Sequence, residues 1–255
     1  MKFALIIICI KKKVKKIKKL LFKDYSTDIA LRYLPVIDLI KQYELKDREI
    51  LEIGSGDQGI SPYLKEKITG LDVRFVEPEN NLIKKIKYDG KNFPFINNKF
   101  DIALSVDSLE HIERDSRQKL INEIFRVTKE AFILVVPCGQ AAYEHDKRIN
   151  DYYVKMNKKR DKYLDDHVNN GLPEKDEIRQ MIKKASDKYN KKIELIFSKK
   201  LLNMKIRYFF MKCHISGNYF LKILYYLFLL FLPIKNFFNF GRCYRQLFFI
   251  KILNN

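Results

Sequence analysis

The chain has 255 residues, 47% of them hydrophobic, and carries 50 Lys and Arg against 31 Asp and Glu, a formal net charge of +19. This composition suffices for one large domain with a sizeable core, and it excludes a disordered or collagen-like chain. The charge is compatible with nucleic acid or anionic lipid as a partner, and equally with a genome rich in Lys and Asn codons. The four cysteines (Cys9, Cys138, Cys213 and Cys243) form no C-x-x-C pair, which fits a reducing cytoplasm.

The first 25 residues combine an apolar run, "MKFALIIICI", with the basic cluster "KKKVKKIKK". Because the cluster follows the apolar run and no small-residue cleavage site is present, this is a poor signal peptide. The run is also too short to span a bilayer as a helix. Residues 1–25 are therefore expected to form a separate arm, either a basic amphipathic helix that contacts an anionic membrane or a solvated tail.

Strand and helix patterns alternate from residue 26 onward. A helix is expected from Ser26–Asp28 to about Tyr43, with Pro35 bending or interrupting it. Helices are also expected at 58–67 and 114–129, and strands at 49–53, 68–75, 82–88, 100–106, 131–137, 192–198 and 245–253. Such alternation predicts an α/β fold with a mostly parallel sheet covered on both faces. Residues 76–81 are too few for a crossover helix and must form a tight loop.

Two insertions interrupt this pattern. Residues 140–190 are highly charged and are expected to form a helical lid over the sheet. Residues 201–244 are the most hydrophobic part of the chain and include twelve successive apolar residues at 223–234 between two lysines. Twelve residues are short for a spanning helix, so 219–240 are expected to lie at an anionic membrane interface. The alternatives are an added helical layer over the sheet and a dimer contact.

The stretch "ILEIGSGDQG" contains Gly54, Gly56 and Gly59 in the pattern G-x-G-x-x-G, which is typical of a nucleotide-binding strand, turn and helix. A dinucleotide or S-adenosylmethionine (SAM) would fit this loop. Glu52, inside the strand, favours SAM, because a carboxylate there suits a ligand with positive charge and would repel a pyrophosphate. Alternatively, Glu52 caps local N–H groups and has a structural role.

Two further carboxylates support nucleotide binding. Asp72 ends the second strand, where a carboxylate accepts hydrogen bonds from ribose hydroxyls in either type of fold. Asp89 ends the third strand and would be placed to accept a hydrogen bond from an adenine amino group. Dinucleotide folds have no fixed requirement at that position, so the set favours SAM.

Together these segments resemble the class I SAM-dependent methyltransferases of the small-molecule, type 11 kind. The resemblance covers about residues 45–139 and rests on E-x-G-x-G, G-x-D, D-G-x-x-x-P-F, F-D-x-x-x-S and L-E-H-I motifs. It implies a Rossmann-like, seven-stranded, mostly parallel sheet with an antiparallel last strand, and SAM as cofactor. It assigns cofactor contacts as follows: Glu52, Gly54, Ser55 and Gly56 to the methionine end, Asp72 to the ribose, Asp89 and Gly90 to the adenine, and Ser105 near the sulfonium.

Asp107 and His111, directly after the fourth strand, are the candidate catalytic residues. A general base matters when the methyl acceptor is a hydroxyl, and His has a suitable pKa for this work. Alternatively, His111 only begins a helix over the adenine pocket. His145 and His167 lie in the expected lid. No His/Cys cluster has zinc spacing, so no metal is expected.

We therefore expect a SAM-dependent methyltransferase that acts on a hydroxyl of a small-molecule or lipid-linked glycan acceptor. We expect it in the cytoplasm, peripheral on the inner face of the membrane. Two alternatives remain, an RNA-modifying methyltransferase and a non-catalytic methyltransferase-like interaction protein. DNA is not expected as a partner, because "SVDS" stands where enzymes acting on amino groups of DNA bases carry an Asn/Asp-Pro-Pro-Tyr turn.

Overall fold

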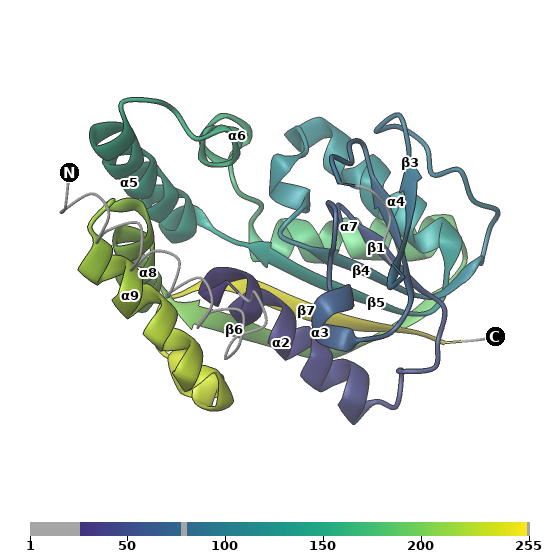
Figure 1. The fold of residues 1–255 in the computed structure, drawn as a ribbon. Helices are drawn as coiled ribbons and strands as arrows, with labels where there is room; N and C mark the ends of the chain where they lie inside the picture. The colour runs from purple at the N-terminus through teal and green to yellow at the C-terminus, as the bar shows by residue number, and fades with distance from the viewer. Residues whose placement is uncertain (1–25, 78–80, 254–255) are drawn as a thin grey trace.

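The computed structural model describes residues 26–77 and 81–253 of the chain, and its centre is a seven-stranded sheet (Figure 1). The strands lie in the order β3-β2-β1-β4-β5-β7-β6. Their bounds are β1 Ile50–Ile53, β2 Ile68–Asp72, β3 Ile83–Lys87, β4 Phe100–Val106, β5 Thr128–Pro137, β6 Lys192–Asn203 and β7 Cys243–Leu253. The expected α/β Rossmann-like sheet is confirmed.

Strand direction decides where the loops meet. Neighbouring strands from β3 to β5 pair in parallel, whereas β7 is antiparallel to both β5 and β6. The carboxyl ends of β1, β2, β4, β5 and β6 therefore share one edge of the sheet, and β7 begins at that edge. In open α/β sheets, ligands bind outside the carboxyl ends of the strands.

The helices cover both faces of the sheet and extend past this edge. They are α2 Thr27–Gln42, α3 Ser61–Leu64, α4 Arg117–Val127, α5 Gln140–Asn157, α6 Lys162–Asn170, α7 Lys175–Lys188, α8 Met204–Ile215 and α9 Tyr219–Leu227. The described residues also form three 3₁₀ segments: the three-residue η1 Leu109–His111 and η2 Arg114–Ser116, and the longer η3 Phe228–Phe238. One core cluster packs α4 and α7 against the sheet, and a second packs α2 against its other face.

Several elements differ from the sequence expectation. Pro35 lies inside α2, which continues to Gln42. The helix expected at 58–67 is a single turn, because Lys65 adopts a left-handed conformation with φ 61° and ends α3. In the lid, α7 is part of the core: Ile178, Met181 and other apolar residues on its inner face are buried. Only α5 and α6 extend beyond the sheet as a lid would.

The helical run in the hydrophobic insert is longer than the twelve successive apolar residues noted in the sequence. Helix α9 and η3 form a helical run, Tyr219–Phe238, that is long and apolar enough to cross a membrane by length and composition, with 11% of its most apolar window buried. The α8–α9–η3 segment leaves the end of β6 and returns to the start of β7, so it lies at the carboxyl edge beside α5 (Figure 1). The N-terminal arm, residues 1–25, lies outside the described residues.

Candidate functional site

The loop after β1 owes its shape to three glycines with positive φ, Gly54, Gly56 and Gly59. A Cβ on Gly54 would lie 2.2 Å from Ser108 Oγ, and one on Gly59 would lie 2.1 Å from Glu52 Oε2. Gly56 faces open space, because nothing lies within 4 Å of where its Cβ would be. Two of the glycines are thus required by close neighbours, and the third leaves the backbone accessible to a ligand.

Glu52 lies beneath this loop and is completely buried. Its Oε2 accepts a hydrogen bond of 2.7 Å from the Ile60 backbone N–H. Burial raises the pKa of Glu52 to about 7, against the opposing effect of that hydrogen bond. The observed contact is therefore the structural one that the sequence left open, in which Glu52 caps a local N–H group. Glu52 supports the loop from below, and a direct contact with the methionine end of SAM stays a prediction.

Two carboxylates tie the loop after β1 to the chain that follows β2. Asp72 Oδ2 accepts a hydrogen bond of 2.8 Å from the Gly56 N–H. Asp57 Oδ1 accepts hydrogen bonds from the N–H groups of Val76 and Glu77 and lies 2.9 Å from Lys85 Nζ. Asp72 was predicted from its position. Asp57 was missed, although its place inside the Gly loop could have indicated a role in holding the neighbouring loop.

The remaining predicted cofactor residues occupy two different surroundings. Asp89 and Gly90 are exposed after β3, and Asp89 Oδ1 accepts hydrogen bonds of 2.8 and 3.2 Å from the next backbone N–H groups. Ser105 is completely buried in β4, between β1 and β5, and its hydroxyl has no hydrogen-bond partner within the described residues. The structure brings Gly54, Ser55, Gly56 and Asp72 together at the carboxyl edge, with Ser105 one strand away.

This arrangement fits SAM. The open space at Gly56 and the half-buried carboxylate of Asp72 lie at adjoining strand ends, so a ligand could approach the loop closely there and a ribose could donate hydrogen bonds to Asp72. The carboxylate of Glu52 in β1 does not face a phosphate site, because it is buried under the loop after β1. The cofactor contacts of the individual residues stay predictions.

Asp107, a candidate base, is held by two arginines. Its carboxylate accepts hydrogen bonds from Arg245 Nε at 2.8 Å and from Arg32 Nη1 at 3.3 Å. Burial alone would raise the pKa of Asp107, but the charges of Arg245 and Arg32 lower it below its ordinary value. A carboxylate held in this way is a poor proton acceptor at neutral pH, so the geometry points to a structural role for Asp107. Arg245 was not singled out from the sequence.

His111, the second candidate, lies in η1 beside the lid helix α6. Its Nδ1 is 3.4 Å from Asp166 Oδ2, and its ring centroid is 4.8 Å from that of His167. Burial and the neighbouring His167 lower the pKa of His111 to about 4, so its ring is neutral at pH 7. Glu110, its neighbour in sequence, is completely buried.

A buried polar network connects this position to the lid and the hydrophobic insert. Asp146 of α5 accepts hydrogen bonds from His167 Nδ1 at 2.7 Å, Arg207 Nη1 at 2.8 Å and Tyr244 Oη at 2.6 Å. These four residues come from α5, α6, α8 and β7. His167 was expected to lie in the lid. No local pattern marks Asp146, Arg207 or Tyr244 in the sequence, because the network exists only in the folded chain.

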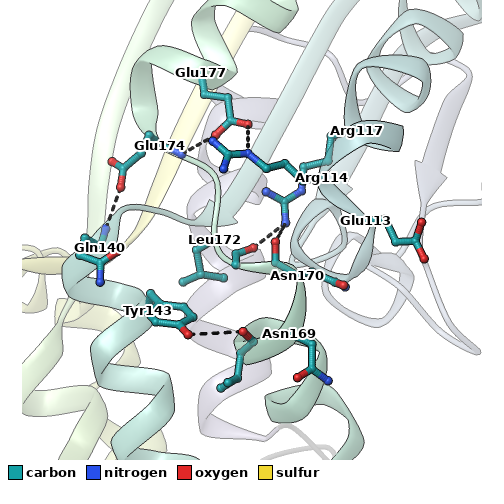
Figure 2. A pocket seen from close by; sticks show the side chains of 12 residues that line it. Glu113, Arg114, Arg117, Gln140, Tyr143, Asn169, Asn170, Leu172, Glu174 and Glu177 are labelled. Atoms are coloured by element: carbon teal, nitrogen blue, oxygen red, sulfur yellow. Dashed lines mark hydrogen bonds and ion pairs between the residues drawn. The ribbon is translucent and has the colours of Figure 1, made fainter.

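A cavity of about 660 Å³ adjoins this network, between η2, α5 and the connection from α6 to α7 (Figure 2). Arg117 lines one side of the cavity and donates hydrogen bonds to the carbonyl groups of Asn170 and Gly171. On the opposite side, Tyr143 donates to the carbonyl of Val168. None of the predicted cofactor residues lines this cavity. It lies on the side of the carboxyl edge where the lid is.

Cys138, after β5, is half-buried, and burial raises the pKa of its thiol to about 12. A thiol of this kind carries almost no thiolate at neutral pH, so it is unsuited to nucleophilic catalysis on a base. Cys138 instead packs against the core cluster that contains α4 and α7.

Comparisons with known proteins agree with this geometry. Residues 51–136 match the family model of the Methyltransferase domain, type 11. The fold is similar to that of the YcgJ protein from Bacillus subtilis (15% identity, 86% of this chain and 98% of that chain, TM-score 0.52). It is equally similar to a protein from Anabaena variabilis assigned as a methyltransferase of an antibiotic biosynthesis pathway (14%, 86% and 98%, TM-score 0.52). A search of curated proteins finds no match.

The matched segment runs from β1 to the end of β5 and so contains the Gly loop, Asp72 and η1. The motifs from Glu52 to His111 on which the resemblance rests all lie within this segment. The alternative of a dinucleotide-binding fold is excluded by this match and by the antiparallel β7. The chain is a class I SAM-dependent methyltransferase of the type 11 group.

Proposed function

We propose that this enzyme methylates a hydroxyl group of a small or lipid-linked glycan acceptor at the surface of an anionic membrane, on its cytoplasmic side. The observation that carries the proposal is the exposed apolar surface of α9 and η3. Their outward side chains recur at helical spacing and are Phe220, Leu227, Leu230, Phe231, Ile234 and Phe237. A contiguous exposed patch of this kind marks an interaction surface.

The opposite side of the same run is packed against the protein. Tyr225 is buried, and Thr27 Oγ1 of α2 donates a hydrogen bond of 2.8 Å to its carbonyl. Lys235 Nζ forms an ion pair of 2.7 Å with Asp38, also of α2. Because one side is attached to α2, the geometry favours a helix that lies in the interface over one that spans the bilayer.

Charge complementarity favours anionic lipid as the occupant. Lys205, Lys212, Lys222 and Arg242 are exposed within the insert and can reach lipid phosphates beside the apolar surface. The insert joins β6 to β7 at the carboxyl edge of the sheet, so a lipid-bound acceptor would be presented to the edge where the cofactor loop lies. This placement supports an amphipathic acceptor.

The chemistry asks little of the protein beyond alignment. SAM supplies a methyl group that is already activated on a sulfonium. The Gly loop and Asp72 would hold the cofactor, and the lid would exclude water. Because Asp107 is held by two arginines, the proton of the acceptor hydroxyl would pass to solvent water rather than to this carboxylate.

Flotation with vesicles tests the membrane surface. Phe220→Ser with Phe237→Ser removes two side chains that are 72% and 76% exposed, and Val76→Ser with Ile96→Ser is a matched control at 72% and 74%. We expect binding to phosphatidylglycerol vesicles that weakens at least about tenfold in the first variant only, by loss of buried apolar area. Equal binding by both variants, or binding equal on phosphatidylcholine, would refute the anionic-membrane proposal.

Transfer of labelled methyl tests the acceptor. The protein is incubated with methyl-labelled SAM and either a membrane lipid extract or a water-soluble extract of the source cells. We expect label in the organic phase that resists mild alkali, because a methyl ether survives conditions that release methanol from a methyl ester. Label only in RNA would support the alternative of an RNA-modifying enzyme.

A further inference from the structure

Three side chains with metal-binding atoms converge between η1 and α6. They are Glu110 and His111 of η1 and His167 of α6, and one ligand atom of each lies within 4.8 Å of the others. Glu110 is 0% exposed and His167 is 7% exposed. We propose that this cluster binds a divalent transition-metal ion, although no metal was expected from the sequence, in which His167 is distant from Glu110 and His111.

The unsatisfied atoms of the cluster point to a missing cation. Both carboxylate oxygens of Glu110 and the Nε2 of His167 are buried without a hydrogen-bond partner within the described residues. His167 Nε2 is 3.8 Å from Glu110 Oε1, too far for a hydrogen bond. Leaving such groups unpaired costs free energy, so buried carboxylates are normally paired or coordinate metals.

Asp146 prepares His167 as a ligand. Its carboxylate, paired with Arg207 at 2.8 Å, accepts a hydrogen bond from the Nδ1–H of His167 at 2.7 Å. The proton is thereby fixed on Nδ1, and the Nε2 lone pair is directed toward Glu110. A carboxylate that accepts the second N–H of a metal-binding histidine is the usual arrangement in metal sites. Arg207 and Tyr244 in turn hold Asp146 in place.

The nearby arginines do not neutralise Glu110. Arg207 is paired with Asp146 at 2.8 Å, and Arg245 is paired with Asp107 and Asp28. Within the described part of the chain, no lysine or arginine forms an ion pair with Glu110. A carboxylate that no lysine or arginine neutralises, and that faces two imidazoles, would gain from a bound metal ion.

The donor set indicates which metals fit. Two imidazoles and one carboxylate suit Zn²⁺, Mn²⁺ or Fe²⁺, whereas Mg²⁺ prefers oxygen ligands alone. Metal–ligand bonds of about 2.1 Å place ligand atoms roughly 3 to 3.5 Å apart, so the side chains need to approach by a small rotation. With three protein ligands, positions remain open for water or another oxygen.

An acceptor hydroxyl that occupies an open position would have a lowered pKa and would lose its proton without a strong base. The α6 segment that carries His167 continues into Val168, Asn169 and Asn170, which line the cavity of Figure 2. This use of the metal rests on the proposed function. Metal binding itself does not, and it is tested separately.

Calorimetric titration of the chelator-treated, full-length protein with Zn²⁺ or Mg²⁺ tests the site, with SAM titration as a check on folding. We expect one equivalent of Zn²⁺ with micromolar or tighter affinity, little heat with Mg²⁺, and a visible absorption band when Co²⁺ is added. Glu110→Gln and His167→Ala should each weaken Zn²⁺ binding at least about tenfold while SAM still binds. His214→Ala, which removes an exposed histidine of α8, is the matched control and should bind Zn²⁺ like the unaltered protein.

The proposal is overturned if Zn²⁺ binds only at millimolar concentration, or if Glu110→Gln and His167→Ala bind it as tightly as the unaltered protein. In the first case a shared proton between Glu110 and His167 would account for the cluster. In the second case Zn²⁺ would be bound at the surface. Either result leaves the vesicle and methyl-transfer experiments unaffected, so the two proposals fail separately.

Discussion

The carboxyl edge has two halves, a cofactor side around the loop after β1 and an acceptor side around η1, the lid and the C-terminal insert. Different kinds of contact hold each half together. On the cofactor side, carboxylates accept hydrogen bonds from backbone N–H groups that are close in the sequence, as Asp72 does from Gly56 and Glu52 from Ile60. On the acceptor side, buried charges pair over long sequence distances, as Arg245 does with Asp107 and Arg207 with Asp146. The first half is therefore specified by a short stretch of sequence, whereas the second forms only when the lid and the C-terminal insert assemble.

The largest effect is expected from Arg245→Met on the acceptor side. Arg245 is buried and pairs with the buried Asp107 and the half-buried Asp28, so its loss leaves Asp107 with Arg32 as its remaining ion-pair partner. We expect the free energy of unfolding to fall by about 3 to 5 kcal/mol in urea titration. Arg179→Met, in an exposed pair with Asp176, is the control and should change it by less than about 0.5 kcal/mol. A fall of the same size in both would contradict the distinction between the two halves.

On the cofactor side, Glu52→Gln is expected to change how the free energy of unfolding depends on pH. Burial raises the pKa of Glu52 from 4.5 to about 7, so the folded state holds a proton that the unfolded chain releases. Stability from this group is fully present below pH 4.5 and is lost as the pH rises to about 7. The whole contribution of Glu52 to the free energy of unfolding corresponds to about 3 kcal/mol. Urea titrations between pH 4 and pH 8 should show this decline relative to Glu52→Gln, and parallel curves would refute it.

The smallest effect is expected from Asp57→Asn, which weakens the tie between the Gly loop and the chain after β2. Asp57 holds Lys85 and two backbone N–H groups through one oxygen. Loss of its charge should weaken SAM binding about three- to tenfold, or about 1 kcal/mol, with little change in Zn²⁺ binding. Calorimetry with both ligands measures this, and an equal effect on both would mean that the two halves are coupled.

Much of the cofactor side could be predicted from the sequence, because its signals are local. The strand expected at 100–106 has the same bounds as β4, and the strand expected at 82–88 contains β3. The Gly loop and Asp72 lie together as expected. The helix after the loop could not be predicted in length, because the left-handed Lys65 that ends it carries no clear sequence signal.

The acceptor side was less predictable for a physical reason. Asp107 was chosen for its position after β4, but Arg245, which determines its charge state, lies at the far end of the chain. In the same way, α7 is as charged as the lid around it, and only the spacing of Ile178, Met181 and Ile182 distinguishes it as a core helix. Ion pairs between distant segments leave no periodic trace in a sequence, so their partners appear only in the fold.

The reversed direction of β7 has a wider consequence. Since β7 begins at the edge where β6 ends, the β6–β7 connection is, within the described residues, the one antiparallel connection of this sheet that opens onto the carboxyl edge. Such a hairpin can grow or shrink without moving β1 or β2, on which the cofactor loop depends. A fold with this topology can therefore change where in the cell it works, and on what, by altering a single late connection while the methyl donor is held as before.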